Sequence, residues 1–236
     1  MIVTQMKPLE EIDKMIEPHS RVLIVGCDGC CQPPRSIHEA NTLGKMLKLK
    51  RMVDGKDFSY KAVTVLRQCD DQICANALRS HVVGYEAMIS LSCGIGVQMM
   101  NKIFPSVITY PAQNTMFNGG MDHTENEYTE LCEQCGDCML GETGGICPVA
   151  GCAKHLLNGP CGGQIDGMCE VGDYERPCAW VSIYKRLKQK GRIDLFQKYR
   201  PMRDFRLMTS PGYIKLLDLD EIGNEISEFM NQEGKA

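Results

Sequence analysis

Eight cysteines lie within the 47 residues from Cys132 to Cys178. They begin with the pattern Cys132-x2-Cys135-x2-Cys138 and continue with Cys147, Cys152, Cys161, Cys169 and Cys178. Closely spaced thiolates are ligands for iron–sulfur clusters and for zinc. The same segment holds ten of the 23 glycines, and glycine permits the tight loops whose backbone N–H groups turn toward such sulfurs. We therefore expect all eight cysteines to bind a cofactor.

The spacing of the first cysteines favours an iron–sulfur cluster over zinc. Bacterial ferredoxins hold [4Fe-4S] clusters with cysteines at intervals of three residues followed by a Cys-Pro pair. Here Cys147-Pro148 follows Cys138 after eight residues instead of three, so the pattern is related and not identical. Zinc sites usually present two separate CxxC pairs. We predict two [4Fe-4S] clusters, while one cluster plus zinc, zinc alone and disulfides stay open as alternatives.

Several longer motifs in this segment carry a family resemblance. They are CxxCGxC, GGICPV, CxKx3NGPCGG, CEV and a final CAW that leads into a helix, and together they cover about a quarter of the chain. In these motifs the segment resembles the cysteine-rich domain in the small iron–sulfur subunit of methylenetetrahydrofolate reductase from acetogenic and related anaerobic bacteria. The same domain forms the C-terminus of some fused reductases.

This resemblance implies a non-catalytic electron-transfer subunit of an oxidoreductase complex. Its partner would be a flavin-containing TIM-barrel subunit that reduces methylenetetrahydrofolate to methyltetrahydrofolate in one-carbon metabolism, as in the Wood-Ljungdahl pathway. The eight cysteines would hold clusters that pass electrons to or from the flavin, and a ferredoxin or another carrier would be the external donor. The alternative is a subunit whose fold is stabilised by zinc and which takes part in assembling such a complex without transferring electrons.

A second set of cysteines lies at or just after the ends of predicted strands. Cys27, Cys30 and Cys31 follow the first strand, Cys69 and Cys74 the second, and Cys93 the third. Because ligands gather at the carboxyl ends of parallel strands, we expect Cys27, Cys30, Cys69 and Cys93 to form a four-thiolate site, with Cys74 or Cys31 as substitute ligands. The site would hold a third [4Fe-4S] cluster or a zinc ion.

Two other interpretations of this second set are weaker. Free cysteines also occur in protein cores as small apolar residues. A catalytic nucleophile at Cys30 or Cys31 would need a nearby base, and the only histidine close in sequence is His38, which is expected on a helix face.

The elements that would position these cysteines alternate between strands and helices over residues 1–125. Short apolar runs rich in β-branched residues predict strands at 21–26, 62–66, 87–91 and 106–110, and helical patterns cover 9–17, 37–53, 71–81 and 95–103. This alternation predicts an α/β, Rossmann-like domain with an open parallel sheet and flanking helices. The phosphate-binding glycine pattern of dinucleotide sites is absent from both candidate turns.

The composition changes abruptly near residue 130, and we predict three parts. Residues 1–125 form the α/β domain, residues 126–190 the cysteine- and glycine-rich ferredoxin-like segment, and residues 191–236 a helical extension. Amphipathic patterns predict helices at 178–190 and 218–231.

Charge and hydropathy exclude two classes of partner. With 26 basic and 30 acidic residues the net charge is -4, which gives no overall field for nucleic acid, and the basic stretch from Lys45 to Arg51 is expected on a solvated helix face. No apolar run approaches the roughly 18 residues of a membrane span, and no signal peptide is recognisable. We expect a cytoplasmic protein whose cysteines are ligands and not disulfides.

Overall fold

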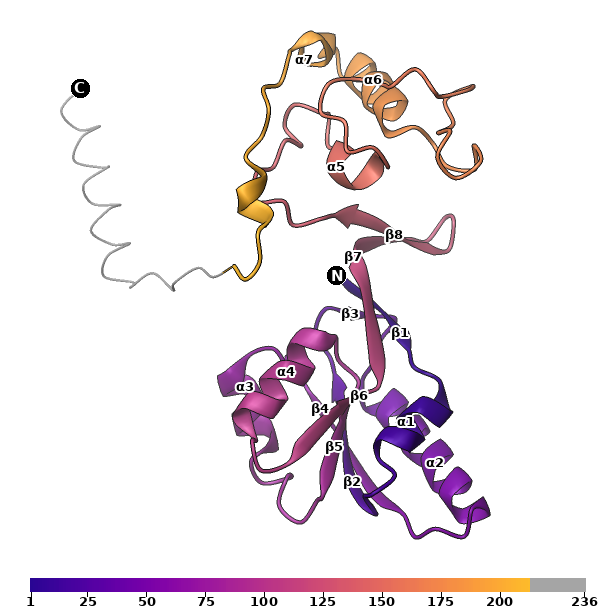
Figure 1. Cartoon of the computed structure of the whole chain (residues 1–236), viewed down its shortest axis with the longest axis vertical. Helices are drawn as coiled ribbons and strands as arrows, with labels where there is room; N and C mark the ends of the chain where they lie inside the picture. The colour runs from indigo at the N-terminus through magenta and orange to yellow at the C-terminus, as the bar shows by residue number, and fades with distance from the viewer. Residues whose placement is uncertain (213–236) are drawn as a thin grey trace, which may run out of the picture.

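A parallel four-stranded sheet forms the centre of the N-terminal part, in a computed structural model that describes residues 1–212 (Figure 1). The strand order is β4-β2-β5-β6, and all neighbours are parallel. The strands are β2 (Arg21–Cys27), β4 (Ser59–Val65), β5 (Ala87–Ser90) and β6 (Ile108–Pro111). This confirms the predicted open parallel sheet and its four strands, with shifts of one to three residues at most ends.

Helices cover both faces of this sheet, as predicted. On one face α1 (Leu9–Met15) and α2 (Ile37–Val53) pack against Val22 and Ile24 of β2. On the other face α3 (Asp71–Leu78) and α4 (Gly94–Ile103) pack against Leu23 and Val25 of the same strand. Successive side chains of a strand point to opposite faces, so the continuous apolar run in β2 supplies both layers.

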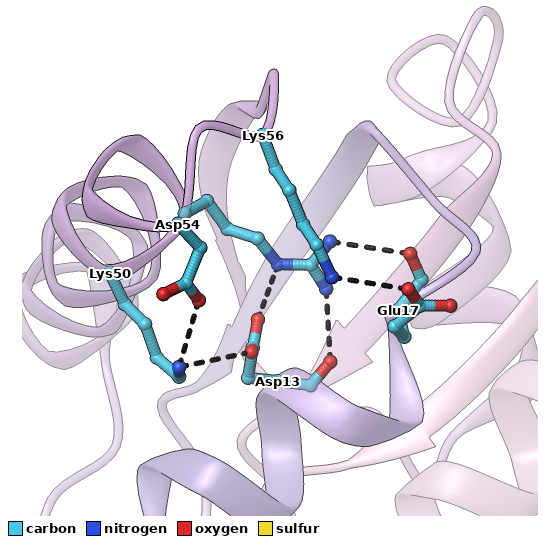
Figure 2. Close-up of polar contacts among 6 residues, drawn as sticks. Asp13, Glu17, Lys50, Asp54 and Lys56 are labelled. Carbon is cyan, nitrogen blue, oxygen red and sulfur yellow. Dashed lines mark hydrogen bonds and ion pairs between the residues drawn. The ribbon is translucent and has the colours of Figure 1, made fainter.

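The contact between α1 and α2 corrects one expectation from the sequence. Arg51, predicted on a solvated face, is only 2% exposed and forms an ion pair with Asp13 of α1. Its guanidinium also donates to the carbonyl oxygens of Asp13 at 2.9 Å and Glu17 at 3.3 Å. Around this pair, Lys50 contacts Asp13 and Lys56 contacts Glu17, as Figure 2 shows. The α1 helix is therefore fixed to α2 by a buried charge and not by apolar contacts alone.

A second four-stranded sheet, with the order β3-β1-β7-β8, was not predicted from the sequence. Its strands are β1 (Ile2–Met6), β3 (Cys31–Gln32), β7 (Gln113–Asp122) and β8 (Glu127–Cys132). In β7 the sequence QNTMFNGGMD is mostly polar or glycine, so it lacks the apolar pattern that marks a strand. The predicted boundary between residues 125 and 126 falls in the turn that joins β7 to β8.

Beyond β8 the chain is largely irregular. The β7–β8 hairpin at the edge of the second sheet connects the parallel sheet to this part (Figure 1). It contains α5 (Pro148–Gly151), α6 (Ala179–Gln189), α7 (Ile193–Gln197) and a 3-10 helix, η1 (Phe205–Met208). The α6 helix confirms the prediction for 178–190 and buries Trp180, Ile183 and Leu187. The predicted helix at 218–231 lies outside the described residues. Within residues 1–212 no helix is long and apolar enough to cross a membrane.

Candidate functional site

Three cysteines of the N-terminal set are buried together at the carboxyl edge of the parallel sheet. Cys27 ends β2, Cys93 follows β5, and Cys31 belongs to the short strand β3, with exposed fractions of 7%, 5% and 3%. The backbone N–H of Cys93 donates to the Sγ atom of Cys31 at 3.3 Å. The strand ends therefore deliver thiols to one rim, as the topology predicts.

Hydrogen bonding within this trio shifts the pKa values of its three thiols. The Cys31 thiol hydrogen-bonds with both neighbours, which lowers the pKa of Cys27 and of Cys93 to about 6 against the opposing effect of burial. The same contacts raise the pKa of Cys31. The trio thus favours the thiolate form at Cys27 and Cys93, and the single S–H proton of Cys31 is available to either sulfur. Thiolates are the form that binds metal ions.

The remaining N-terminal cysteines take different places. Cys30 and Cys69 are exposed at the rim, and partial shielding of the Cys69 sulfur from water is the main cause that raises its pKa. Cys74 is fully buried on α3 beside Leu78, in the hydrophobic layer under the sheet, and burial raises its pKa to about 11. Of the two substitute ligands considered from the sequence, Cys31 lies beside Cys27 and Cys93, whereas Cys74 packs as an apolar residue.

A buried polar network lies next to the thiol trio, at the carboxyl ends of β2 and β5. It was not predicted from the sequence. Gln68 donates through its amide to the carbonyl oxygens of Val25 and Gly26 at 3.0 and 2.8 Å. Its amide oxygen accepts from the Ser90 hydroxyl at 2.6 Å, and Ser92 donates to the Cys93 carbonyl at 3.0 Å. The signal available in the sequence was a polar residue directly before a cysteine after an apolar strand, as in Gln68-Cys69 and Ser92-Cys93; the burial of these polar residues is visible only in the structure.

In the cysteine-rich part, backbone N–H groups point at sulfur atoms. The N–H of Gln134 donates to Cys132 Sγ, and the N–H of Gly163 donates to Cys161 Sγ, each at 3.4 Å. Among the described residues, twelve of the sixteen with left-handed φ lie between 132 and 178, which is the backbone conformation that turns N–H groups inward. These loops have the local geometry of thiolate-binding turns.

The eight C-terminal cysteines are distributed over several loops and two helix starts. Cys147 and Cys178 precede α5 and α6, and Cys152 packs with Cys178 against the cluster around Trp180. Cys161 lies 3.7 Å from the Lys154 ammonium group and 3.6 Å from a carboxylate oxygen of Glu170. Cys132, Cys135, Cys138 and Cys169 lie on irregular chain or, for Cys132, at the end of β8.

The donor chemistry of this part fits a thiolate-bound cofactor. All fourteen cysteines are free thiols, and the sulfurs of Cys132 and Cys161 already accept backbone N–H groups. Across residues 1–212, no three His, Cys, Asp or Glu side chains are arranged as a formed metal site. The cysteines are therefore present in the right number and type, on loops that would have to bring them closer together around a cofactor.

The two cysteine sets approach each other at the junction of the sheets. Cys30 and Cys132 line the same hollow of about 190 Å³, together with Ile2 and Asn118. The pairing of β1 with β3 and β7 brings these segments together, since Ile2 is the partner of both Cys31 and Asn118. Sequence reasoning treated the two sets as separate, because the sheet that joins them was not predicted.

Comparison with known proteins bears on the cysteine-rich part. Residues 110–206 match the family model described as "Methylene-tetrahydrofolate reductase C terminal". Over this range the chain is similar to the C-terminal part of methylenetetrahydrofolate reductase. The matched range contains β7, β8, all eight C-terminal cysteines and the chain up to η1. Searches of curated proteins and of solved structures gave no match.

Proposed function

We propose that this chain is the iron–sulfur electron-transfer subunit of a methylenetetrahydrofolate reductase complex. The observation that carries the proposal is the match of residues 110–206 to the C-terminal family of this reductase, because that range holds all eight cysteines from Cys132 to Cys178. Eight thiols in one irregular, glycine-rich segment exceed what a single metal ion needs, and several centres serve electron conduction.

In this proposal the eight cysteines hold two [4Fe-4S] clusters, which supply one-electron transfer when bound. The chain's own contribution is to place thiolates on loops whose N–H groups donate to sulfur, as Gln134 and Gly163 do for Cys132 and Cys161. Such hydrogen bonds and nearby charges are the means by which a protein sets the reduction potential of a cluster.

The N-terminal trio extends the proposal to a third centre. Cys27, Cys31 and Cys93 would hold a further [4Fe-4S] cluster or a zinc ion, with Cys30 or Cys69 from the exposed rim as the fourth ligand. The hollow shared by Cys30 and Cys132 supports an arrangement in which this centre neighbours the C-terminal ones. The buried network of Gln68, Ser90 and Ser92 would hold the strand ends in place around it.

The proposed partner is a flavin-containing TIM-barrel subunit that carries the folate site and reduces methylenetetrahydrofolate. The present chain would exchange electrons with that flavin and take them from a ferredoxin or another cytoplasmic carrier. We infer no catalytic residue in the chain itself.

The experiment is metal and sulfide analysis of the full chain after anaerobic purification. We expect brown protein with roughly eight to twelve irons per chain, matching acid-labile sulfide, and visible absorbance that dithionite bleaches, since each [4Fe-4S] centre contributes four irons. Colourless protein that contains only zinc would overturn the proposal. That result would favour the second candidate, an assembly subunit whose cysteines bind zinc and do not transfer electrons.

Electron transfer is tested in the complex with the flavin subunit. Cys135→Ala should slow flavin reduction by a low-potential donor and leave the partner's folate binding unchanged. Cys74→Ala, in the hydrophobic layer of the N-terminal domain, is the matched cysteine control. Unchanged flavin reduction in Cys135→Ala would place the centre near Cys135 off the electron route.

A further inference from the structure

The segment from Lys198 to Met208, which we call the C-terminal strap, crosses the Cys132–Cys138 loop. A Cβ atom at Gly136 would lie 3.0 Å from the Cβ of Leu207, so strap and loop are in close contact there. Gly136 has a left-handed φ of 78°, and the close approach adds a second reason for glycine at this position. The Arg203 guanidinium donates to the carbonyl oxygen of Asp137 and lies 3.6 Å from its carboxylate.

The strap is anchored to the other loops of the cysteine-rich part through Arg200. Its backbone N–H donates to the Asn158 side chain, and the Asn158 amide donates back to the Arg200 carbonyl, both at 2.8 Å. The Arg200 guanidinium donates to Glu142 at 3.0 Å and lies over the Trp180 ring at 5.6 Å. Because Arg200 is buried and exchanges two hydrogen bonds with Asn158, the strap is held at a defined position over the loop.

A cavity of about 300 Å³ lies between the strap and the cysteine loop. Its lining includes Cys138 and Met139 on one side and Arg200, Met202 and Arg203 on the other. The Arg203 side chain is only 5% exposed, and its Nε atom is buried without a hydrogen-bond partner among the described residues. A buried, charged donor that lacks an acceptor is costly, so this N–H has a strong preference for an anionic group.

We propose that Arg203 is a positioning residue for the anionic, thiolate-bound group of the Cys135–Cys138 loop. It acts in two ways. It fixes the loop through the Asp137 carbonyl, to which the Cys135 thiol also donates at 3.8 Å, and it supplies positive charge and a free Nε–H at the cavity that Cys138 lines from the other side. The inference rests on the proposed function, because it takes the group bound there to be an iron–sulfur cluster.

The electrostatic consequence has a definite sign. Reduction adds one negative charge to a cluster, and a buried cation stabilises the more negative state because few water molecules screen it. Removal of the Arg203 charge should therefore lower the midpoint potential of the cluster near Cys138. A purely structural role in holding the strap would affect cluster content or stability without this directed shift in potential.

The experiment compares Arg203→Gln and Arg203→Lys with Arg206→Gln in the full chain. Arg206 lies three residues further along the strap, is 89% exposed and pairs only with Asp204 among the described residues, so it is a matched control. We expect Arg203→Gln to shift the one-electron reduction equilibrium by about tenfold, which is about 59 mV toward lower potential. Arg203→Lys, which keeps the charge, should recover most of that shift.

A second measurement uses the same variants in metal-free, reduced form. Alkylation of Cys135 and Cys138, followed peptide by peptide, should be several-fold faster in Arg203→Gln than in wild type, because the loop is no longer held to the strap. Cys161, outside this loop, should react at an unchanged rate. If Arg203→Gln loses its iron, Arg203→Lys gives the potential and the alkylation rates still report on the loop.

The outcomes separate the inference from the proposed function. Equal potentials and equal alkylation rates in Arg203→Gln and Arg206→Gln would overturn the role of Arg203 and leave the electron-transfer proposal standing. Wild-type protein without iron would end the electron-transfer proposal, while the alkylation rates would still decide whether Arg203 holds the cysteine loop.

Discussion

The backbone N–H of Cys93 donates a hydrogen bond to the sulfur of Cys31 at 3.3 Å, across 62 residues of sequence. The bond joins the start of α4, three residues after the parallel strand β5, to the first residue of β3, a short strand of the second sheet. Cys27 completes the trio from the end of the neighbouring strand. Three chain segments thus bring their thiols to one buried position. Substitution of these cysteines therefore tests the proposed N-terminal centre directly.

We expect Cys31→Ala to weaken metal binding at the N-terminal centre that we propose. Loss of an outer-shell partner alone costs roughly 10–100-fold in affinity, so loss of a direct ligand should cost at least as much. Competition with a chelator in the full chain measures the effect. Cys74→Ala is the control, because Cys74 lies in the apolar layer and its loss should leave metal content unchanged. Metal loss in Cys74→Ala, with retention in Cys31→Ala, would contradict this assignment.

The stability of the metal-free, reduced protein should rise with pH between about 6 and 9. The pKa of Cys27 and of Cys93 is lowered from the ordinary value of 9.0 to about 6. A lowered folded-state pKa stabilises the protein above the unfolded value, and this stabilisation is lost as the pH falls through the folded value. Urea unfolding at pH 6, 7.5 and 9 measures it, and Cys31→Ala should flatten the dependence. A decrease in stability over this range would show that the trio is not thiolate-rich.

Gln68→Ala should destabilise the chain by about 1–3 kcal/mol, the cost of leaving buried polar groups unsatisfied. Gln68 is fully buried, and its side-chain amide donates hydrogen bonds to two backbone carbonyls and accepts one from the Ser90 hydroxyl. Denaturant unfolding of the metal-free protein separates this effect from metal binding. Gln72→Ala, at an exposed position of α3, should change stability by less than about 0.5 kcal/mol. Equal effects at the two positions would mean that the network does not stabilise the strand ends.

Arg51→Ala should destabilise the chain by about 3–5 kcal/mol, the cost of breaking a buried ion pair from one side. Asp13, 13% exposed at its side chain, would lose its main partner, and α1 its anchor to α2. Lys56→Ala removes the exposed pair with Glu17 in the same region (Figure 2) and should cost no more than about 1 kcal/mol. Thermal or urea unfolding compares the two variants. A small effect of Arg51→Ala would indicate that apolar contacts alone hold α1.

The parallel sheet and its helices could be predicted because their signals are local. An apolar run such as Val22–Val25 has to be buried on both faces, and helical spacing from Ile37 to Val53 predicts the helix that covers one of them. The second sheet had no such signal. In β7 the side chains are mostly polar, and its strand conformation depends on pairing with β1, more than 100 residues earlier.

The sequence by itself determined the number and type of the candidate ligands, since thiol chemistry and the spacing of Cys132, Cys135 and Cys138 are properties of the chain. Only the tertiary structure decided which cysteines are neighbours. Helical geometry turns Cys74 into the apolar layer, whereas pairing of β1 with β3 brings Cys31 to the strand ends. It also decided that Arg51 is buried and that Arg203 lies against the cysteine loop. The physical reason is that the β1–β3 pairing and the contacts of Cys31, Arg51 and Arg203 each join segments at least 29 residues apart, and no local pattern encodes such a contact.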